Sequence, residues 1–564
     1  MSYRAQTDDI RFIYSHVAGL DQVRGTDRFA EASEDLTDAV LEGIGKICED
    51  VVAPTWRDGD LTPAKLENGV VRTSPGFKEA FAEVAEGGWM AVSGPEAYGG
   101  MGLPIALTTA FNEMMSSANM ALGLCPLLTQ GQVEALEHHA SDALKELYLP
   151  KLISGEWTGT MNLTEPQAGS DVGALKSKAV PNDDGTYAIS GQKIFITWGD
   201  HDMGGNVCHL VLARLPDGVA GTKGISLFMV PKYIPDEAGN PGVANELKVV
   251  SLEHKMGIHG SPTAVMQFDG AKGWLVGAPH AGMAAMFTMM NNARLGVGAQ
   301  GVGIAESAYQ TALSYAKERE QFGPIVQHAD VRRMLLTMKA EIFAARSIVM
   351  SCAVALDMAG ATAAPEWRAR AALLTPIAKA FGTDAGIAVA DLGVQIHGGM
   401  GYIEETGAAQ YSRDVRITSI YEGTNGIQAM DLVGRKMMDG GEAANVLLDE
   451  IEAYAESVRA KMPDLAEPVW QACETLREGV EWLVAQTDMN TRFAGSAPFL
   501  KAFARVLGGH SHLKAAMAEG GAGPRTKLAR FYIRRLLPEH EAALTHAMAG
   551  ADDLYAFSLD DLEA

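Results

Sequence analysis

The stretch RDVRITSIYEGTNGIQ, residues 413–428, is the most informative part of this sequence. An apolar approach brings Tyr421 and Glu422 into a turn of glycine, threonine and asparagine, and an amphipathic pattern resumes after the turn. Glu422 therefore stands at a break in the chain beside Gly423, which has no side chain to block a ligand. Two interpretations fit: Glu422 is a general base for a bound substrate, or it is an acidic residue stabilised at an ordinary helix start.

The length and composition are those of a multidomain globular protein. A chain of 564 residues predicts two to four domains, and its 47% apolar and 21% charged residues are typical of soluble proteins. The formal net charge of −24 and the absence of a dense lysine and arginine cluster argue against a nucleic-acid partner.

Several common kinds of site are not indicated by the sequence. Five cysteines are scattered without CxxC spacing, which argues against a disulfide framework and a zinc site. His510 and His512 lack the spacing of metal ligands on one helical face, so we expect them to be solvated and predict no metal. Charged residues precede any apolar run at the N-terminus, and no apolar run reaches membrane-spanning length. We therefore expect a cytoplasmic protein that does not enter a membrane.

The pattern of apolar and turn-forming residues changes at three points along the chain. We expect an α+β multidomain protein with a helical N-terminal domain, a central β-barrel-like domain, a C-terminal four-helix bundle and an extra C-terminal helical module. These domains are expected at residues 1–155, 156–275, 276–438 and 439–564. Apolar periodicity predicts helices at residues 29–52, 76–86, 104–120, 131–153, 283–319, 329–359 and 365–397. Pro376 should kink or divide the last of these.

The segment Gly296-Val297-Gly298-Ala299-Gln300-Gly301 matches the pattern GxGxxG of dinucleotide-binding proteins. A true fingerprint follows a strand and opens a helix, whereas this segment lies inside a continuous helical pattern. We therefore interpret its glycines as a small-residue face for close helix packing.

Four dense motifs carry the strongest signal when they are taken together. They are TEPQAGSD at residues 164–171, KIFIT at 193–197, EREQFG at 318–323 and QIHGGMG at 395–401. In this order, and with IYEG at residues 420–423, they resemble the acyl-CoA dehydrogenases over about residues 80–435. That family holds FAD between its β domain and its C-terminal helices, and it oxidises the Cα–Cβ bond of a CoA thioester to the trans-2-enoyl-CoA.

The resemblance assigns roles to particular residues. Glu422 matches the family's catalytic base, flanked by Tyr421 and Gly423, which shape access to the thioester. Arg294 matches a CoA-binding arginine, and Ser170 falls where the family contacts both the cofactor and the CoA arm. The residues expected to bind FAD are Leu163, Thr164, Ser170, Phe195, Thr197, Arg319, Gln321, Phe322, Gln395, Gly398, Gly399 and Thr424.

Six of these cofactor residues, between Arg319 and Gly399, match positions that reach the FAD of a neighbouring subunit, so the resemblance implies an obligate oligomer. Two positions depart from the family pattern: Asn291 replaces an acidic residue that often precedes the CoA-binding arginine, and Gly426 stands where shorter members often carry glutamine.

The long tail resembles the larger bacterial acyl-CoA dehydrogenases, which include the 3-methylmercaptopropionyl-CoA dehydrogenases, and such long forms imply a homodimer. The expected electron acceptor is an electron-transfer flavoprotein. A substrate of 3-(methylthio)propanoyl-CoA in dimethylsulfoniopropionate breakdown fits this group. The alternatives are a β-oxidation dehydrogenase of short, medium or long acyl-CoA, an acyl-CoA oxidase, and a DNA-binding flavoprotein of the alkylation response.

Overall fold

The structure is a computed structural model that describes residues 3–564. The chain divides into two compact units. The first unit contains Gln6–Asp38 and Arg294–Ala564, and the second contains Ala39–Ala293 with a short N-terminal segment ending at Ala5. Helix α8 contributes its first turns to the second unit and its remainder to the first.

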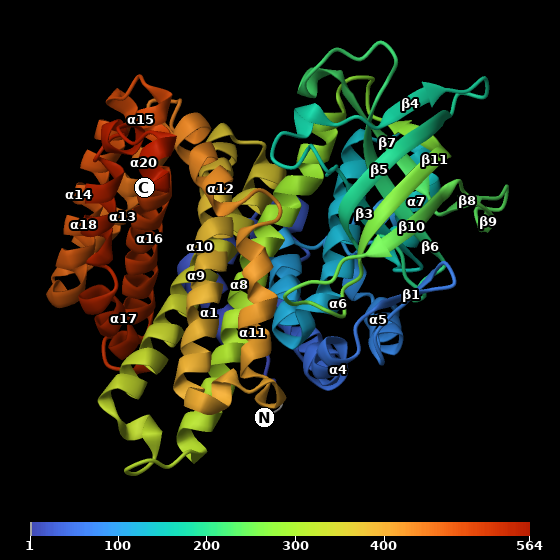
Figure 1. The fold of residues 1–564 in the computed structure, drawn as a ribbon. Helices are drawn as coiled ribbons and strands as arrows, with labels where there is room; N and C mark the ends of the chain where they lie inside the picture. The colour runs from blue at the N-terminus through green and yellow to red at the C-terminus, as the bar shows by residue number, and fades with distance from the viewer. Residues whose placement is uncertain (1–2) are drawn as a thin grey trace. The chain divides into compact units, whose positions relative to one another are not determined.

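The second unit is built around one seven-stranded sheet (Figure 1). Its strands are β3 Trp157–Asn162, β4 Lys178–Pro181, β5 Tyr187–Thr197, β6 Asn206–Arg214, β7 Ile225–Pro231, β10 Leu247–Leu252 and β11 Thr263–Val276. Pairing runs from β11 through β5 and β4 to β6, and returns from β6 through β7 to β11. This closed circuit confirms the barrel-like domain, and β10 and β3 extend it beyond β11 and β6.

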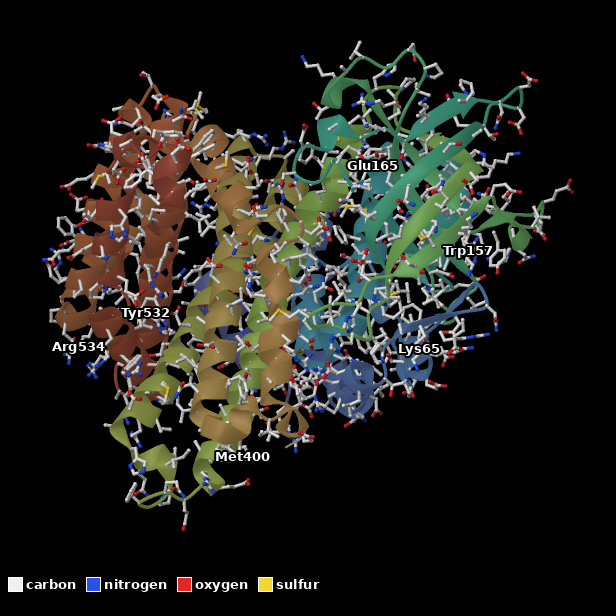
Figure 2. All side chains as sticks on the ribbon, viewed as in Figure 1. Lys65, Trp157, Glu165, Met400, Tyr532 and Arg534 are labelled. Carbon is white, nitrogen blue, oxygen red and sulfur yellow. The ribbon has the colours of Figure 1, made fainter. Side chains whose placement is uncertain are left out.

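Buried apolar side chains from different strands hold this circuit together. Ile189 of β5, Phe228 of β7 and Phe268 of β11 belong to one cluster, and each is at most 1% exposed. Burying each of them contributes about 1.5–3 kcal/mol relative to exposure to water. A second cluster joins the strands to the N-terminal helices through Tyr148 and Trp157, whose rings meet edge to face at 5.7 Å. Trp157 is labelled in Figure 2.

The rest of the second unit consists of helices and two short hairpins. They are α3 Glu34–Ile47, which begins in the first unit, α4 Trp56–Leu61, α5 Phe77–Glu86, α6 Ile105–His139, α7 Asp142–Ile153, and the hairpins of β1 Lys65–Glu67 with β2 Val70–Arg72 and of β8 Tyr233–Pro235 with β9 Pro241–Ala244.

Helix α6 runs through residues 121–130, where the sequence predicted a gap between two helices, and the helix predicted at residues 131–153 is divided between α6 and α7. The chain bends at Asn119, which has φ −161° and ψ 93°, and then continues as helix. The Asn119 side chain donates to Thr55 Oγ1 at 2.9 Å and accepts from the Leu122 N–H at 3.3 Å. The asparagine therefore caps the second half of α6, so no connecting loop is needed.

The first unit is helical throughout. Its bundle contains α8 Gly282–Glu318, α9 Ala329–Thr362, α10 Pro365–His397, and a broken fourth element made of α11 Ala408–Val415, the 3₁₀ turn Arg416–Ser419 and α12 Asn425–Asp431. The predicted long helices match within three residues at each end. Pro376 does not divide α10, which runs unbroken to His397.

The glycines of the GxGxxG segment pack α8 against α10, as predicted. A Cβ placed on Gly298 would lie 2.8 Å from the Ala378 carbonyl oxygen, and one on Gly301 would lie 2.2 Å from the Gly382 carbonyl oxygen. A Cβ on Gly382 would in turn meet the Gly298 carbonyl at 2.6 Å. The two helix backbones therefore touch along a stripe that admits no side chain.

The extra C-terminal helical module, residues 439–564, adds further helices to the first unit (Figure 1). They are α13 Glu442–Arg459, α14 Pro463–Ala485, α15 Met489–Ala494, α16 Ser496–Ala518, α17 Pro524–Arg535, α18 Glu539–Ala547, α19 Asp552–Tyr555 and α20 Leu559–Glu563. Helix α16 packs on α9, where Arg505 and Glu341 form a buried ion pair at 2.7 Å.

The expectation that His512 is solvated was wrong. Its side chain is 1% exposed, stacks on Tyr532 with ring centroids 4.5 Å apart, and hydrogen-bonds to the Ala340 carbonyl oxygen at 3.1 Å. Burial lowers the pKa of His512, so the ring is neutral at physiological pH. The histidine is a core residue that joins α16 to α9 and α17.

One helix among residues 3–564, α9, is long and apolar enough to meet the length and hydropathy of a membrane span. However, 83% of its most apolar window is buried inside the protein, as in the core helix of a bundle.

Candidate active site

The turn that carries Glu422 has an unusual backbone. Glu422 has φ +57° and Gly423 has φ +80°, so two consecutive residues are left-handed. The left-handed region costs a non-glycine residue about 1–3 kcal/mol and is kept where surrounding contacts fix it. Those contacts come from Gln428, whose side-chain amide donates to the carbonyl oxygens of Glu422 and Gly423 at 3.2 Å each. The hydroxyl of Thr424 caps α12 by accepting from the Ile427 N–H at 3.2 Å.

The electrostatic setting of Glu422 suits a proton acceptor. Burial raises the pKa of the carboxyl group to about 7, and the positive charges of Arg294 and Lys379 limit that rise. A group with a pKa near the working pH can both take up and release a proton. Perturbed values of this kind concentrate at functional sites.

Arg294 lies on α8 beside the same turn. Its side chain is 8% exposed, lies 4.0 Å from the Asp431 carboxylate, and has Nη2 at 3.8 Å from the position of a Cβ on Gly423. Burial lowers the pKa of Arg294 and its acidic neighbours raise it, but an arginine stays charged in proteins. The structure thus brings three of the predicted site residues together: Arg294, Glu422 and Gly423.

Tyr421 is anchored to the glycine-rich part of α8. Its hydroxyl donates a short hydrogen bond of 2.5 Å to Gln300 Oε1. Burial raises the pKa of Tyr421, so the hydroxyl keeps its proton at any physiological pH. This bond positions the residue that precedes Glu422.

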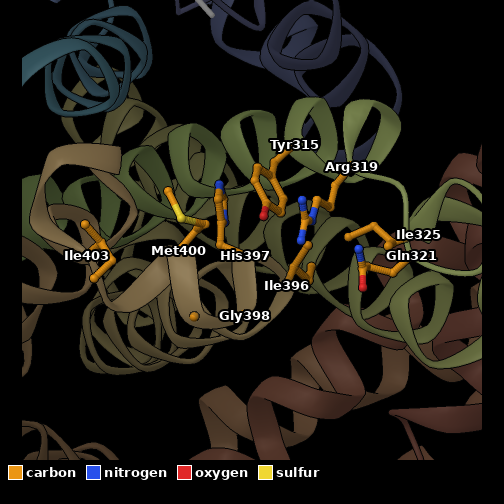
Figure 3. A pocket seen from close by; sticks show the side chains of 10 residues that line it. Tyr315, Arg319, Gln321, Ile325, Ile396, His397, Gly398, Met400 and Ile403 are labelled. Atoms are coloured by element: carbon orange, nitrogen blue, oxygen red, sulfur yellow. The ribbon is translucent and has the colours of Figure 1, made fainter.

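A pocket of about 480 Å³ opens at the C-terminal ends of α8 and α10 (Figure 3). It is lined by Tyr315, Arg319, Gln321, Ile325, Ile396, His397, Gly398, Gly399, Met400 and Ile403. Four of the predicted cofactor residues therefore line one cavity. Of the other two at this end, Gln395 is exposed beside the pocket and Phe322 is fully exposed with φ +54°.

The chemistry of this pocket suits a diphosphate joined to a flat ring. A Cβ added to Gly398 or Gly399 would meet no atom within 4 Å, so their backbone is open to a ligand, and Arg319 offers a guanidinium beside them. The His397 ring stacks on Tyr315 with centroids 4.3 Å apart, which gives the pocket a flat aromatic wall. These residues fit part of an FAD molecule.

The predicted flavin-binding residues of the second unit gather around the ends of β3 and β5. Leu163 and Thr164 follow β3, and the Thr164 carbonyl accepts from the Ile194 N–H at 2.9 Å. Phe195 sits where β5 and β11 shift register, with φ +60° and a side chain 59% exposed. A bulge of this kind re-aims a side chain, and here it turns an aromatic ring toward solvent. Thr197 ends β5 opposite Thr263, and Ser170 is exposed.

A buried ion pair fixes the loop after β3. Lys193 Nζ donates to Glu165 Oε1 at 2.8 Å and to the Leu163 carbonyl at 3.0 Å. The side chains of Lys193 and Glu165 are 0% and 4% exposed, and Glu165 is labelled in Figure 2. Burial raises the pKa of Glu165, but Lys193 and the donors of Ser177 and Lys176 outweigh it and hold the value at about 2. The pair therefore stays ionised and links β5 to the TEPQAGSD loop.

Sequence reasoning missed Lys379 and Gln300. Lys379 is a single cation in the apolar run TPIAKAFG; it lies completely buried, and its positive charge lowers the pKa of Glu422. A charged residue in an otherwise apolar stretch was the signal that could have identified it. Residues 3–564 contain no group of three or more histidine, cysteine or acidic side chains placed to hold a metal ion.

Four family models match consecutive parts of the chain. They are the acyl-CoA dehydrogenase N-terminal domain at residues 37–156, its middle domain at 160–271, its C-terminal domain at 280–438, and an acetyl-CoA dehydrogenase C-terminal-like domain at 447–558.

Similar proteins extend this match over most of the chain. A 3-methylmercaptopropionyl-CoA dehydrogenase of Ruegeria pomeroyi is 47% identical over 519 residues, covering 89% of this chain and 88% of that protein. The broad-specificity linear acyl-CoA dehydrogenase FadE5 of Mycobacterium tuberculosis is 36% identical over 483 residues, covering 81% and 79%. The crystal structure of Caenorhabditis elegans ACDH-11 in complex with C11-CoA has the same fold, with a TM-score of 0.79 at 21% identity over 93% of this chain and 91% of that one.

Proposed function

This chain belongs to the acyl-CoA dehydrogenase family and is an FAD-dependent oxidoreductase of acyl-CoA thioesters. From that premise we propose that Glu422 is its catalytic base and that 3-(methylthio)propanoyl-CoA is its substrate. The observation that carries the first part is the left-handed turn that holds Glu422 near two cations. Burial raises the pKa of Glu422 in this turn to about 7. The second part is supported by the 47% identity to the Ruegeria pomeroyi enzyme.

The residues of this turn divide the work of the reaction. The Glu422 carboxylate takes the α-proton of the thioester, and the backbone N–H of the same residue stabilises the negative charge that develops on the thioester oxygen. Bound FAD would supply the acceptor for the hydride that leaves the β-carbon. Arg294 binds the CoA moiety, and Tyr421 and Gly423 shape the approach to the carboxylate.

The remaining predicted residues hold the cofactor in this proposal. Leu163, Thr164, Ser170, Phe195 and Thr197 contact FAD from the β domain, with Ser170 also touching the CoA arm. Thr424 contacts it beside the base. Residues Arg319, Gln321, Phe322, Gln395, Gly398 and Gly399 reach the FAD of a second subunit, so the active form is a homodimer.

The same proposal covers domains, acceptor and location. The domains are residues 1–155, 156–275, 276–438 and 439–564, which the intervals of the four family models support. The acceptor is an electron-transfer flavoprotein. The enzyme is cytoplasmic, and its five buried free cysteines suit a reducing compartment.

Replacing the base tests the catalytic assignment. Glu422→Gln should keep FAD bound but slow the bleaching of flavin absorbance by substrate by about 10²–10⁴-fold, because a general base contributes about that much. Bleaching at the wild-type rate would remove Glu422 from the mechanism.

A matched pair of substrates tests the acyl group. Pentanoyl-CoA has the shape of 3-(methylthio)propanoyl-CoA with a methylene in place of sulfur, so the ratio of their kcat/KM values isolates the thioether. We expect the thioether substrate to have the higher value. A higher value for pentanoyl-CoA or for a longer straight chain would instead support a β-oxidation dehydrogenase. Hydrogen peroxide release without an added acceptor would mark an oxidase.

A further inference from the structure

Lys379 occupies a position that few lysines take. It lies on α10 inside an apolar run, and its side chain is 0% exposed. An ammonium group buried without partners would cost several kcal/mol, so its surroundings must compensate the charge. The first compensating contact is a hydrogen bond of 2.8 Å from Lys379 Nζ to Asn425 Oδ1.

Asn425 is held from its other end as well. Its side-chain nitrogen donates to Asp384 Oδ1 at 2.7 Å and to Thr383 Oγ1 at 2.9 Å. These acceptors fix the amide so that its oxygen faces Lys379. Asn425 is the first residue of α12 and follows Glu422 by three positions, so α10 clamps the end of the catalytic turn through this one side chain.

The charges around Glu422 come from three elements. Arg294 of α8 faces it, but Arg294 also faces Asp431 of α12, which Arg435 approaches at 3.3 Å. Lys379 of α10 supplies the second cation, and the acid near it on the same helix is Asp384, which lies at the surface.

From these contacts, and resting on the proposed function, we infer that Lys379 is a positioning residue for the catalytic base. It holds the Glu422 turn through Asn425, and its positive charge favours the carboxylate form of Glu422. The titration behaviour agrees with this geometry, because burial lowers the pKa of Lys379 to about 8 while Glu422 and Asp384 raise it. At pH 7 the lysine is therefore predominantly protonated.

Two substitutions separate the two roles. Lys379→Gln removes the charge but keeps a donor for Asn425, whereas Lys379→Met removes both at similar volume. The readout is the rate of flavin bleaching by substrate in the holoenzyme from pH 5.5 to 9, with FAD content and thermal unfolding measured for each variant. Removing the cation should move the midpoint of the pH profile upward by about one pH unit or more in both variants. Lys379→Met should also lower the plateau rate, which Lys379→Gln should largely preserve.

Asp384→Asn gives the opposite test at an exposed position. Removing this negative charge favours the carboxylate of Glu422, so the midpoint should move downward. It also decides the matter if Lys379→Met does not fold or hold FAD. Midpoints that coincide with the wild-type value in Lys379→Gln and Asp384→Asn would overturn the inference. Failure of the proposed function is a separate result, because then no acyl-CoA would bleach the wild-type flavin.

Discussion

Glu422 combines a strained backbone, partial burial and two neighbouring cations in one residue. The hydrogen bonds from Gln428 hold the strained turn in place, and burial removes water that would otherwise solvate the carboxylate. The cations oppose the burial and set how much of the basic form exists at neutral pH.

The first prediction at this scale concerns pH. Only the carboxylate form of Glu422 can accept the α-proton, and its pKa in the free enzyme is about 7. The value of kcat/KM should therefore rise with pH through about 7 and level off above it, with a tenfold loss for each pH unit well below the midpoint. Stopped-flow bleaching at several substrate concentrations would measure this, with FAD absorbance as the control for retention of the cofactor. A flat profile from pH 5.5 to 8.5 would contradict it.

The second prediction concerns the buried pair of Glu165 and Lys193. Lys193→Met leaves a buried carboxylate without its counter-charge, which costs about 3–5 kcal/mol in the free energy of unfolding. Lys248→Met is the matched control on the same sheet, because its partner Asp269 is 50% exposed and such surface pairs contribute about 0–1 kcal/mol. Denaturant titration of both variants measures the difference.

The ion pair of Glu165 and Lys193 also predicts how the stability of the fold depends on pH. The pKa of Glu165 is about 2 in the folded protein, below its ordinary value of 4.5. Its contribution to stability is therefore present above about pH 4.5 and is lost as the pH falls toward 2. If Lys193→Met and Lys248→Met lowered the free energy of unfolding equally, the prediction of a larger cost for the buried pair would be contradicted.

At the scale of single residues the sequence predicted chemistry better than conformation. Glu422, Arg294 and four residues of the α8–α10 pocket were assigned from the resemblance that the motifs carry, because that resemblance depends on residue types and order that stand in the sequence itself. The positive φ of Phe195 depends on where β5 and β11 slip in register, and the burial of Lys379 depends on α12 closing over α10. Both are set by contacts between segments far apart in the chain, which local patterns do not contain.

At the scale of elements the periodicity of apolar residues was a sufficient guide for α8, α9 and α10. Each of these helices is 33 to 37 residues long and is buried on most sides, so apolar residues recur along its whole length. Helix α6 was predicted in two parts because a run with small residues and Pro126 weakens that repeat, while Asn119 supplies a cap that only the folded chain reveals.

The glycine stripe between α8 and α10 leads to a prediction at this scale. Gly301→Ala places a methyl group 2.2 Å from the Gly382 carbonyl oxygen, so the helices must separate. Overpacking of this kind costs about 1–3 kcal/mol, and the displacement should also reduce FAD retention because Tyr421 is bonded to the neighbouring Gln300. Thermal unfolding and the ratio of flavin to protein measure both effects.

Gly393→Ala is the matched control on α10. Its added Cβ would have its nearest neighbour at 3.6 Å, an ordinary contact, and its backbone is helical. This change should be neutral or slightly stabilising, because alanine is the better helix former. If both substitutions lowered the unfolding temperature equally, close packing of the backbones would not be the reason for the glycines.

At the scale of the whole molecule, the two groups of predicted cofactor residues lie in different compact units. One group surrounds the ends of β3 and β5, and the other lines the pocket that contains Arg319 and Gly399. The proposed homodimer accounts for this division, because each FAD would then be held by the β domain of one subunit and the pocket of the other. Side chains exposed beside the pocket, Phe322 and Tyr402 at 104% and 87%, suit a surface that a second copy covers.

Subunit complementation tests this arrangement directly. Two variants are prepared: Glu422→Gln, which lacks the base, and Arg319→Ala, which lacks the pocket guanidinium. Each homodimer should be inactive or nearly so, the first in proton abstraction and the second through loss of FAD. In a mixed dimer, one site combines the intact Glu422 of the Arg319→Ala subunit with the intact Arg319 of its partner, so that site should work. Random assortment of the two chains would then give about a quarter of the wild-type activity per FAD-binding site. Differently tagged chains purified as the mixed dimer should reach about half, whereas a cofactor held wholly within one subunit would leave the mixed dimer as inactive as its parents.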